Sequence, residues 1–209
     1  MKINRYVANN GFATNAYLVW DEESKEAFIV DPGSELPSAA EFIDREGLKL
    51  EYIMITHAHG DHTGGIGFFK EKYPDAKLLA SRAERKLLYN RAASFGKGGY
   101  TADVEVRDGD ELEIGGIKLR FIDCPGHTSG GMSIYADNKF LFSGDTLFHA
   151  SVGRTDLPGG DWDALVETLR NKIYVLPDDT VVLPGHMDET QIGWEKRYNP
   201  FVQINDQGR

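Results

Sequence analysis

The 209-residue sequence contains one cysteine, Cys124, and this excludes a disulfide within the chain. A single thiol fits a reducing compartment, and Cys124 is expected to be a small buried apolar residue. No apolar run approaches the roughly 18 residues that a membrane-spanning helix needs. The first residues, Met1–Tyr6, also lack the apolar core of a signal peptide. We therefore expect a cytoplasmic protein with no membrane partner.

Positive charge is also scarce in this chain. It has 23 Lys and Arg against 33 Asp and Glu, a formal net charge of −10 that repels nucleic acid phosphates. It also lacks a run of Lys and Arg, a low-complexity segment, a short-period repeat and a linker that would divide it. We expect a single domain over residues 1–209 that takes a small-molecule substrate, with neither a nucleic acid partner nor an obligate protein partner.

What the sequence does have is a regular succession of apolar segments. Those with strand character are Lys2–Val7, Thr14–Trp20, Glu26–Val30, Leu50–Ile55, Lys77–Ala80, Glu111–Ile114, Ile117–Ile122, Met132–Ala136, Lys139–Ser143 and Val181–Leu183. Two turn signals, Gly115-Gly116 and Asp137-Asn138, each join two of these segments. Residues 91–102 are expected to form a loop.

Helices are predicted between the strands. The first begins at Pro37 and ends at Gly47, and another passes through Phe68, Phe69 and Tyr73 before Pro74 stops it. The capping-box pattern Ser81–Glu84 predicts a third, Asp161 can cap a fourth, and a last helix is expected over Thr190–Asn199. Strands followed by helices, twice over, predict an α/β fold: two sheets facing each other with helices outside, a four-layer αββα sandwich.

The densest chemical feature follows the predicted strand Leu50–Ile55. Three of the six histidines and an aspartate fall within six residues there: His57, His59, Asp61 and His62. Imidazole and carboxylate are ligands of zinc and similar divalent metals. A glycine-rich loop at the end of a buried strand is a suitable place to hold them. We therefore predict a metal site rather than a surface histidine tract.

Three more candidate ligands share one local pattern. His127, Asp145 and His186 each come after a strand-like segment, and each has a glycine directly before it. Taken singly, a Gly-Asp pair after a strand is more often a turn than a ligand. Together with the first cluster these residues give seven ligands, too many for one tetrahedral ion and suited to two ions that share a bridging carboxylate. We expect two divalent ions, with zinc favoured and iron or manganese compatible. The remaining histidine, His149, is not assigned as a ligand.

The pattern His-x-His-x-Asp-His, followed by separate His, Asp and His, resembles the metallo-β-lactamase superfamily over essentially the whole chain. The resemblance implies the αββα sandwich and a ligand assignment. It puts His57, His59 and His127 on one ion, puts Asp61, His62 and His186 on the other, and makes Asp145 the bridge. It also matches Asp31, in Val30-Asp31-Pro32-Gly33, to a position that supports the metal loop; a turn residue is the equal alternative.

Two further motifs narrow the resemblance. Residues 151–157, which contain Gly153-Arg154-Thr155-Asp156, and residues 192–201 are similar to segments of the small, single-domain bacterial members of the glyoxalase II-like group. These members lack the separate C-terminal helical domain of full-length glyoxalase II. Arg154 could hold a substrate carboxylate, or could pair with Asp156 and shape the loop. Met187 departs from the family's Gly-His-Gly pattern.

The resemblance implies a metal-dependent thioester hydrolase, acting on S-lactoylglutathione or a similar thioester through an activated water that Asp61 orients and deprotonates. Asp145 argues against the β-lactamases that carry a cysteine at this position. Iron-dependent persulfide dioxygenases are similar too, and would use only His57, His127 and Asp145 to hold one iron. A hydrolase of lactones or phosphodiesters is a third alternative.

Overall fold

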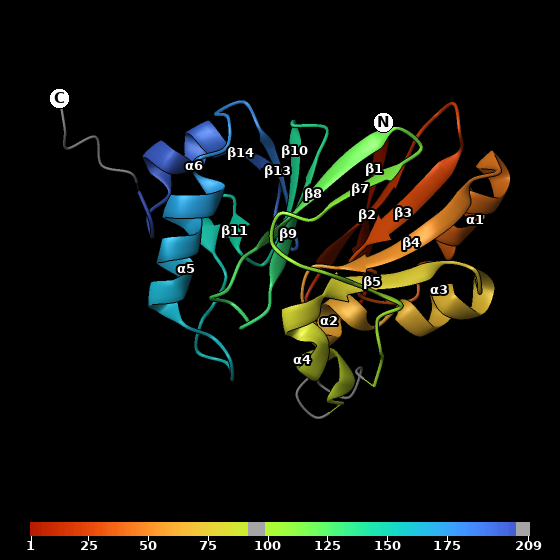
Figure 1. The fold of residues 1–209 in the computed structure, drawn as a ribbon, viewed down its shortest axis with the longest axis horizontal. Helices are drawn as coiled ribbons and strands as arrows, with labels where there is room; N and C mark the ends of the chain where they lie inside the picture. Colours follow the sequence, from red (N-terminus) through yellow and green to blue (C-terminus); the bar gives the residue numbers. More distant parts are fainter. Residues whose placement is uncertain (92–98, 204–209) are drawn as a thin grey trace.

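Two six-stranded sheets face each other in the structure, a computed structural model that describes residues 1–91 and 99–203 (Figure 1). The first has the order β1-β2-β3-β4-β5-β6, and the second has the order β14-β13-β10-β9-β8-β7. The strands of the first sheet are β1 Lys2–Ala8, β2 Thr14–Trp20, β3 Glu26–Val30, β4 Lys49–Ile55, β5 Lys77–Ser81 and β6 Val104–Val106. Those of the second are β7 Glu111–Ile114, β8 Ile117–Asp123, β9 Met132–Ala136, β10 Phe140–Gly144, β13 Val181–Pro184 and β14 Thr190–Gln191. The pair β11 Leu147–Phe148 and β12 Ser151–Val152 forms a small separate ladder.

Helices cover the outer faces of both sheets (Figure 1). They are α1 Pro37–Glu46, α2 Gly60–Thr63, α3 Ile66–Lys72, α4 Arg85–Tyr89, α5 Trp162–Thr168 and α6 Ile192–Tyr198. A 3₁₀ turn, Arg82–Glu84, precedes α4, and a π-helical turn, Leu169–Ile173, continues α5. In the part of the chain that the structure describes, no helix is long and apolar enough to cross a membrane.

Three separate apolar cores lie between these layers. The first packs Ile29 and Ile53 of one sheet against helical residues such as Ile43 and Phe69. The second fills the space between the sheets, with Val19, Phe28, Phe121 and Phe142 among its members. The third packs Leu141 and Val182 against Leu165 and Ile192 of α5 and α6. Three cores require four layers, and the predicted αββα sandwich is confirmed.

Local sequence signals account for most element boundaries. Pro37 begins α1, and Gly47 ends it in a left-handed conformation with φ of 64°. Asp137 and Asn138 both have positive φ, as a tight hairpin turn between β9 and β10 requires. Asp161 caps α5, because its side chain accepts a hydrogen bond from the Ala164 N–H at 3.0 Å. The loop predicted over residues 91–102 lies largely outside the described residues.

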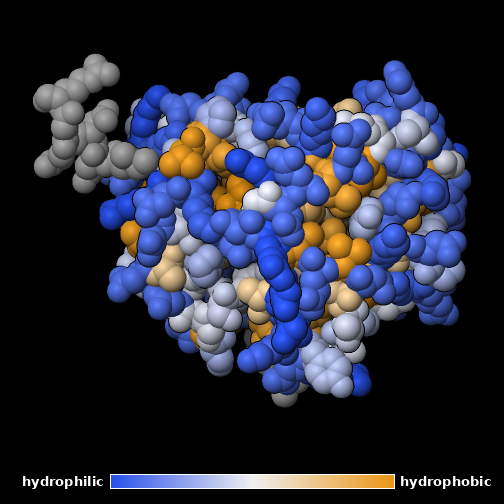
Figure 2. Space-filling view, in the orientation of Figure 1, coloured by the Kyte–Doolittle hydropathy of each residue, from blue (hydrophilic) through white to orange (hydrophobic). Residues whose placement is uncertain are grey.

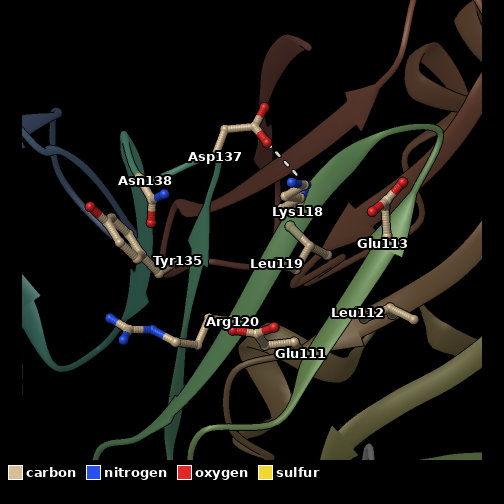
Figure 3. Close-up of a pocket in the computed structure, with 9 residues that line it drawn as sticks. All are labelled: Glu111, Leu112, Glu113, Lys118, Leu119, Arg120, Tyr135, Asp137 and Asn138. Atoms are coloured by element: carbon tan, nitrogen blue, oxygen red, sulfur yellow. Dashed lines mark hydrogen bonds between the residues drawn. The ribbon is translucent and has the colours of Figure 1, made fainter.

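The predicted alternation in β8 is confirmed. Leu119 and its apolar neighbours face the second core, whereas Lys118 and Arg120 are exposed on the opposite face. Figure 3 shows that face, where the two basic residues lie across from acidic residues of β7: Glu111 opposite Arg120, and Glu113 opposite Lys118. These side chains line an open pocket with a volume of about 820 Å³. Hydrophilic residues also cover most of the face drawn in Figure 2, and a few apolar patches show between them.

One local prediction is wrong in part. Ser81 does cap the turn before α4, since its hydroxyl accepts a hydrogen bond from the Ala83 N–H at 3.2 Å. In a capping box Glu84 would reach back to the Ser81 N–H, but its carboxylate accepts hydrogen bonds from Ala58, Thr128 and Gly130 instead. Tertiary contacts have therefore overridden the local motif.

Candidate metal centre

The seven predicted ligands meet where strands of both sheets end. His57 and His59 follow β4, and Asp61 and His62 lie on the short helix α2. His127 follows β8, Asp145 follows β10 and His186 follows β13. The strands β8, β10 and β13 run in the same direction and so end at one edge of the second sheet, and β4 of the first sheet ends close to that edge, so residues distant in the chain converge.

Ligand atoms come together in overlapping groups, within each of which all atoms lie within 4.8 Å of one another. One group is His57, His59 and His127, and another is Asp61, His62 and His186. A third, His57, His62 and Asp145, joins the other two. The structure thus brings together the two ligand sets that the sequence predicts. The binding of an ion by each set stays a prediction.

Glycine permits this close approach. Gly144 has φ of 52°, and a Cβ atom there would lie 2.4 Å from Oγ1 of Thr56. At Gly185 a Cβ atom would lie 2.4 Å from Oδ1 of Asp145 and 2.6 Å from Cε1 of His62. Both positions therefore exclude a side chain, which explains the glycines that precede Asp145 and His186.

Three histidine rings are each held by one nitrogen and turn the other toward the cluster. Nδ1 of His62 lies 2.9 Å from Oδ2 of Asp31, and Nδ1 of His127 lies 2.7 Å from the backbone oxygen of Arg154. Nδ1 of His186 lies 3.1 Å from the backbone oxygen of Phe12. Because only a protonated Nδ1 can donate to these oxygens, the neutral form of each ring carries its lone pair on Nε2, where a metal would need it.

Asp145 lies between the two ligand sets. Its Oδ1 is 3.3 Å from Nε2 of His62, and its Oδ2 is 3.4 Å from Nε2 of His186 and 3.6 Å from Nε2 of His127. Oδ2 of Asp61 lies 3.3 Å from the same nitrogen of His186. One carboxylate thus contacts members of both sets, as a bridging ligand must.

Several buried polar atoms of the cluster have no hydrogen bond. They are Nε2 of His57, Nε2 of His62 and Oδ1 of Asp145; the 3.3 Å between the last two atoms does not have hydrogen-bond geometry. Leaving buried polar atoms unpaired is costly, and such atoms are rare in native proteins. A divalent cation would pair all three, so the donor set fits a metal.

Burial and the carboxylates have opposite effects on the charge of the histidines in the cluster. Burial, together with the facing His62, holds the pKa of His57 well below its usual value, and burial lowers that of His59 to about 4. Burial also opposes the charged form of His186, yet hydrogen bonds to Asp145 and Asp61 raise its pKa to about 9. The carboxylates thus attract either a proton or a cation, and we expect cation binding to release protons.

Asp31 supports the cluster and has an unusual backbone conformation. Its carboxylate accepts hydrogen bonds from the Thr56 N–H at 2.7 Å and the Thr56 hydroxyl at 2.6 Å, in addition to its contact with His62. Its φ of 49° is left-handed, but the structure assigns no turn at residue 31. The contacts of Asp31 therefore favour the supporting role.

Sequence reasoning missed two residues that hold Asp61. Asn10 donates a hydrogen bond to the Asp61 backbone oxygen at 2.8 Å, and the Thr14 hydroxyl donates to its carboxylate at 3.3 Å. Neither lies in a motif, so only the fold reveals them. Asp61 also lies in the wall of a cavity of about 530 Å³ that Phe12 and Glu35 help to line.

The other candidates take simple roles. Arg154 makes a bidentate pair with Asp156, with both N–O distances 2.7 Å, and both side chains are exposed. The ring of His149 packs against Trp194 at 5.0 Å and belongs to none of the ligand groups. Met187 has φ of 68°, the left-handed region that favours glycine. Cys124 is buried, as predicted, and burial raises the pKa of its thiol to about 11.

Known proteins are similar to this chain in sequence and in fold. A model of the metallo-beta-lactamase superfamily matches residues 9–186. The hydroxyacylglutathione hydrolase GloC of Haemophilus influenzae is 35% identical over 200 residues, 91% of this chain and 93% of that protein. The human mitochondrial persulfide dioxygenase ETHE1 is 34% identical over 198 residues, 92% of this chain and 72% of that protein. The crystal structure of the B3 metallo-beta-lactamase BLEG-1 superposes with a TM-score of 0.89 at 33% identity, covering 97% of this chain and all of that one. The chain belongs to the metallo-beta-lactamase superfamily.

Proposed function

We propose that the protein is a metal-dependent thioester hydrolase of the glyoxalase II type, acting on S-lactoylglutathione or a similar thioester. The observation that carries the proposal is the pair of convergent ligand sets joined through Asp145, a donor arrangement suited to two divalent ions. The similarity to GloC over nearly the full length of both proteins supports the thioester class.

The ions would be held by His57, His59 and His127 on one side and by Asp61, His62 and His186 on the other. Two such ions supply a water of lowered pKa and polarise the thioester carbonyl. Because a thiolate is a good leaving group, the site needs no strong general acid.

Asp61 would orient the attacking water and accept its proton. Burial opposes ionisation of this carboxyl, but the hydrogen bond from His186 and the charge of His62 lower its pKa below the usual value. The ionised carboxylate can accept a proton, and Thr14 and Asn10 fix the position of Asp61. Its place in the wall of the 530 Å³ cavity gives a substrate a path to it.

Arg154 would hold a substrate carboxylate. Its guanidinium is exposed and already binds the carboxylate of Asp156 in the bidentate geometry that a substrate carboxylate would require. Substrate binding at this place would therefore exchange one carboxylate partner for another.

A persulfide dioxygenase is the second candidate, favoured by the similarity to ETHE1. It would need one iron at His57, His127 and Asp145. Nε2 of His127 lies 3.6 Å from Oδ2 of Asp145, and the rings of His57 and His127 are 4.7 Å apart, so these three residues also converge.

Metal analysis combined with a substrate panel separates these functions. The panel holds S-lactoylglutathione, other thioesters, a lactone, a phosphodiester, a β-lactam and glutathione persulfide, the last with oxygen uptake recorded. We expect two ions per chain, thioester hydrolysis without oxygen uptake, and loss of that activity in Asp61→Ala. One iron per chain with oxygen uptake would establish the dioxygenase. A metal-replete protein that hydrolyses no thioester would refute the proposal.

A further inference from the structure

Glu84 is a buried carboxylate that contacts both loops of one ligand set. Its side chain is 1% exposed, on the 3₁₀ turn that follows β5. Oε1 accepts a hydrogen bond from the Ala58 N–H at 2.9 Å, and Oε2 accepts one from the Thr128 hydroxyl at 3.2 Å. The Gly130 N–H is a third donor. These donors are 26, 44 and 46 residues away along the chain.

The three donors lie close in the sequence to ligands of the first set. Ala58 lies between His57 and His59, and Thr128 directly follows His127. Glu84 thus joins the two segments that carry the first ligand set, without touching a ligand side chain. None of these three hydrogen bonds comes from Asp61, His62 or His186.

The packing around Glu84 leaves no space for a side chain at Gly130. A Cβ atom at Gly130 would lie 2.6 Å from Oε2 of Glu84 and 2.4 Å from its backbone nitrogen, so the loop after His127 lies directly on the glutamate. No ion pair of the described residues includes Glu84, and burial raises the pKa of its carboxyl. Only the donors of the two ligand loops compensate for burying the carboxylate.

We propose that Glu84 is a positioning residue for the metal centre, which fixes the distance between the His57–His59 segment and the His127 loop and so sets the affinity of the first ion. The inference rests on the proposed metal centre and deepens it. It predicts a selective defect, because the second ligand set is supported by Asp31, Asn10 and Thr14 instead.

Glu195 provides a matched control. It is 0% exposed and likewise accepts hydrogen bonds from a backbone N–H, a threonine hydroxyl and a third donor: Ala150 at 3.1 Å, Thr190 at 2.7 Å and Asn199 at 2.7 Å. These contacts hold α6 and the β11–β12 turn, not the ligand loops of the first set. Replacing either glutamate by alanine removes a buried carboxylate that accepts several hydrogen bonds.

The test measures zinc affinities by chelator competition and cobalt absorption spectra for Glu84→Ala, Glu84→Gln, Glu195→Ala and Glu195→Gln. Urea unfolding of the metal-free proteins gives their stabilities. For Glu84→Ala we expect the dissociation constant of one metal equivalent to rise about 10–100-fold, with a changed cobalt spectrum. Glu84→Gln should fall in between, because its amide can accept from Ala58 and donate to Thr128 but leaves Gly130 unpaired. The Glu195 variants should keep both dissociation constants within about threefold, whatever stability they lose.

Wild-type affinity for both equivalents in Glu84→Ala, or an equal loss in Glu195→Ala at equal stability, would overturn the proposal. If Glu84→Ala does not fold, Glu84→Gln and Thr128→Val test the proposal instead. Both variants must then weaken the binding of the same metal equivalent. A wild-type protein that binds no divalent ion overturns the metal centre as well. Inactivity toward thioesters with both ions bound refutes only the proposed function.

Discussion

Replacing Asp31 by asparagine tests whether the buried carboxylate determines which ring nitrogen of His62 carries the proton. Asparagine has the same shape and tolerates the left-handed φ of 49° that Asp31 adopts, so the backbone conformation there should persist. What changes is the hydrogen bonding. Three donors converge on the carboxylate, two from Thr56 and one from His62, whereas an amide offers one acceptor oxygen and one donor nitrogen.

Either orientation of the amide disturbs the site. With its oxygen on Thr56, its nitrogen faces Nδ1 of His62 and moves the ring proton to Nε2, the atom directed at Asp145. With its oxygen on His62, its nitrogen faces the Thr56 N–H and leaves both groups without an acceptor. Losing one or two hydrogen bonds to a buried carboxylate, at about 1.5–3 kcal/mol each, predicts a fall of roughly 1.5–6 kcal/mol in the free energy of unfolding. The affinity of the ion held by His62 should fall about 10–100-fold.

Urea unfolding of metal-free protein gives the first quantity, and zinc competition gives the second. Asp161→Asn is the matched control, because Asp161 caps α5 and asparagine caps a helix equally well. The control should change the free energy of unfolding by less than about 0.5 kcal/mol and leave both zinc affinities unaltered. An Asp31→Asn protein with wild-type stability and wild-type zinc affinities would refute this account of the His62 contact.

Three further predictions concern other positions. Gly185→Ala should lose bound metal with unchanged circular dichroism, because its Cβ atom would meet both Asp145 and His62; undiminished metal content would contradict this. The Cys124 thiol should resist iodoacetamide at pH 8 until the protein unfolds, since burial raises its pKa to about 11. Between about pH 9 and pH 11 the native thiol then keeps a proton that the unfolded state has lost, so the free energy of unfolding should fall as the pH rises through this range. Urea midpoints measured across this range should not show this fall in Cys124→Ala. Arg154→Ala should leave the thermal midpoint nearly unchanged and raise KM only for thioesters that carry a free carboxylate; equal KM values for substrates with and without it would remove Arg154 from the binding site.

The sequence was sufficient to predict those elements that local chemistry specifies. Gly115-Gly116 and the alternation in Ile117–Ile122 predict the β7–β8 hairpin, and the structure has it at those residues. Pro37 and Gly47 mark both ends of α1. The strands β11 and β14 were not predicted, because two residues carry no periodicity and owe their conformation to neighbours elsewhere in the chain.

Glu84 illustrates the same limit at the site. Its spacing from Ser81 is that of a capping box, and the local pattern contains nothing of Ala58 or Thr128. These residues meet because the parallel strands β4 and β5 end at one edge of the first sheet and the loop after β8 of the second sheet reaches the same place, so the contact is a property of topology. By contrast, the seven candidate ligands could be proposed from the sequence because metal binding requires particular side chains, and the fold brings these side chains together.

The hydrogen bonds that orient the ligand rings show most clearly the difference between what a sequence motif specifies and what depends on the fold. His127 and His186 each hold a backbone oxygen, of Arg154 and of Phe12, and every residue type provides such an oxygen. No sequence motif can therefore specify which nitrogen of these rings faces the centre of the ligand cluster. Asp31 is the exception, because a side chain performs this task for His62 and its identity is accordingly constrained. The sequence thus specifies which groups can bind, while the path of the backbone after β1 and after β12 decides how two of the rings are presented.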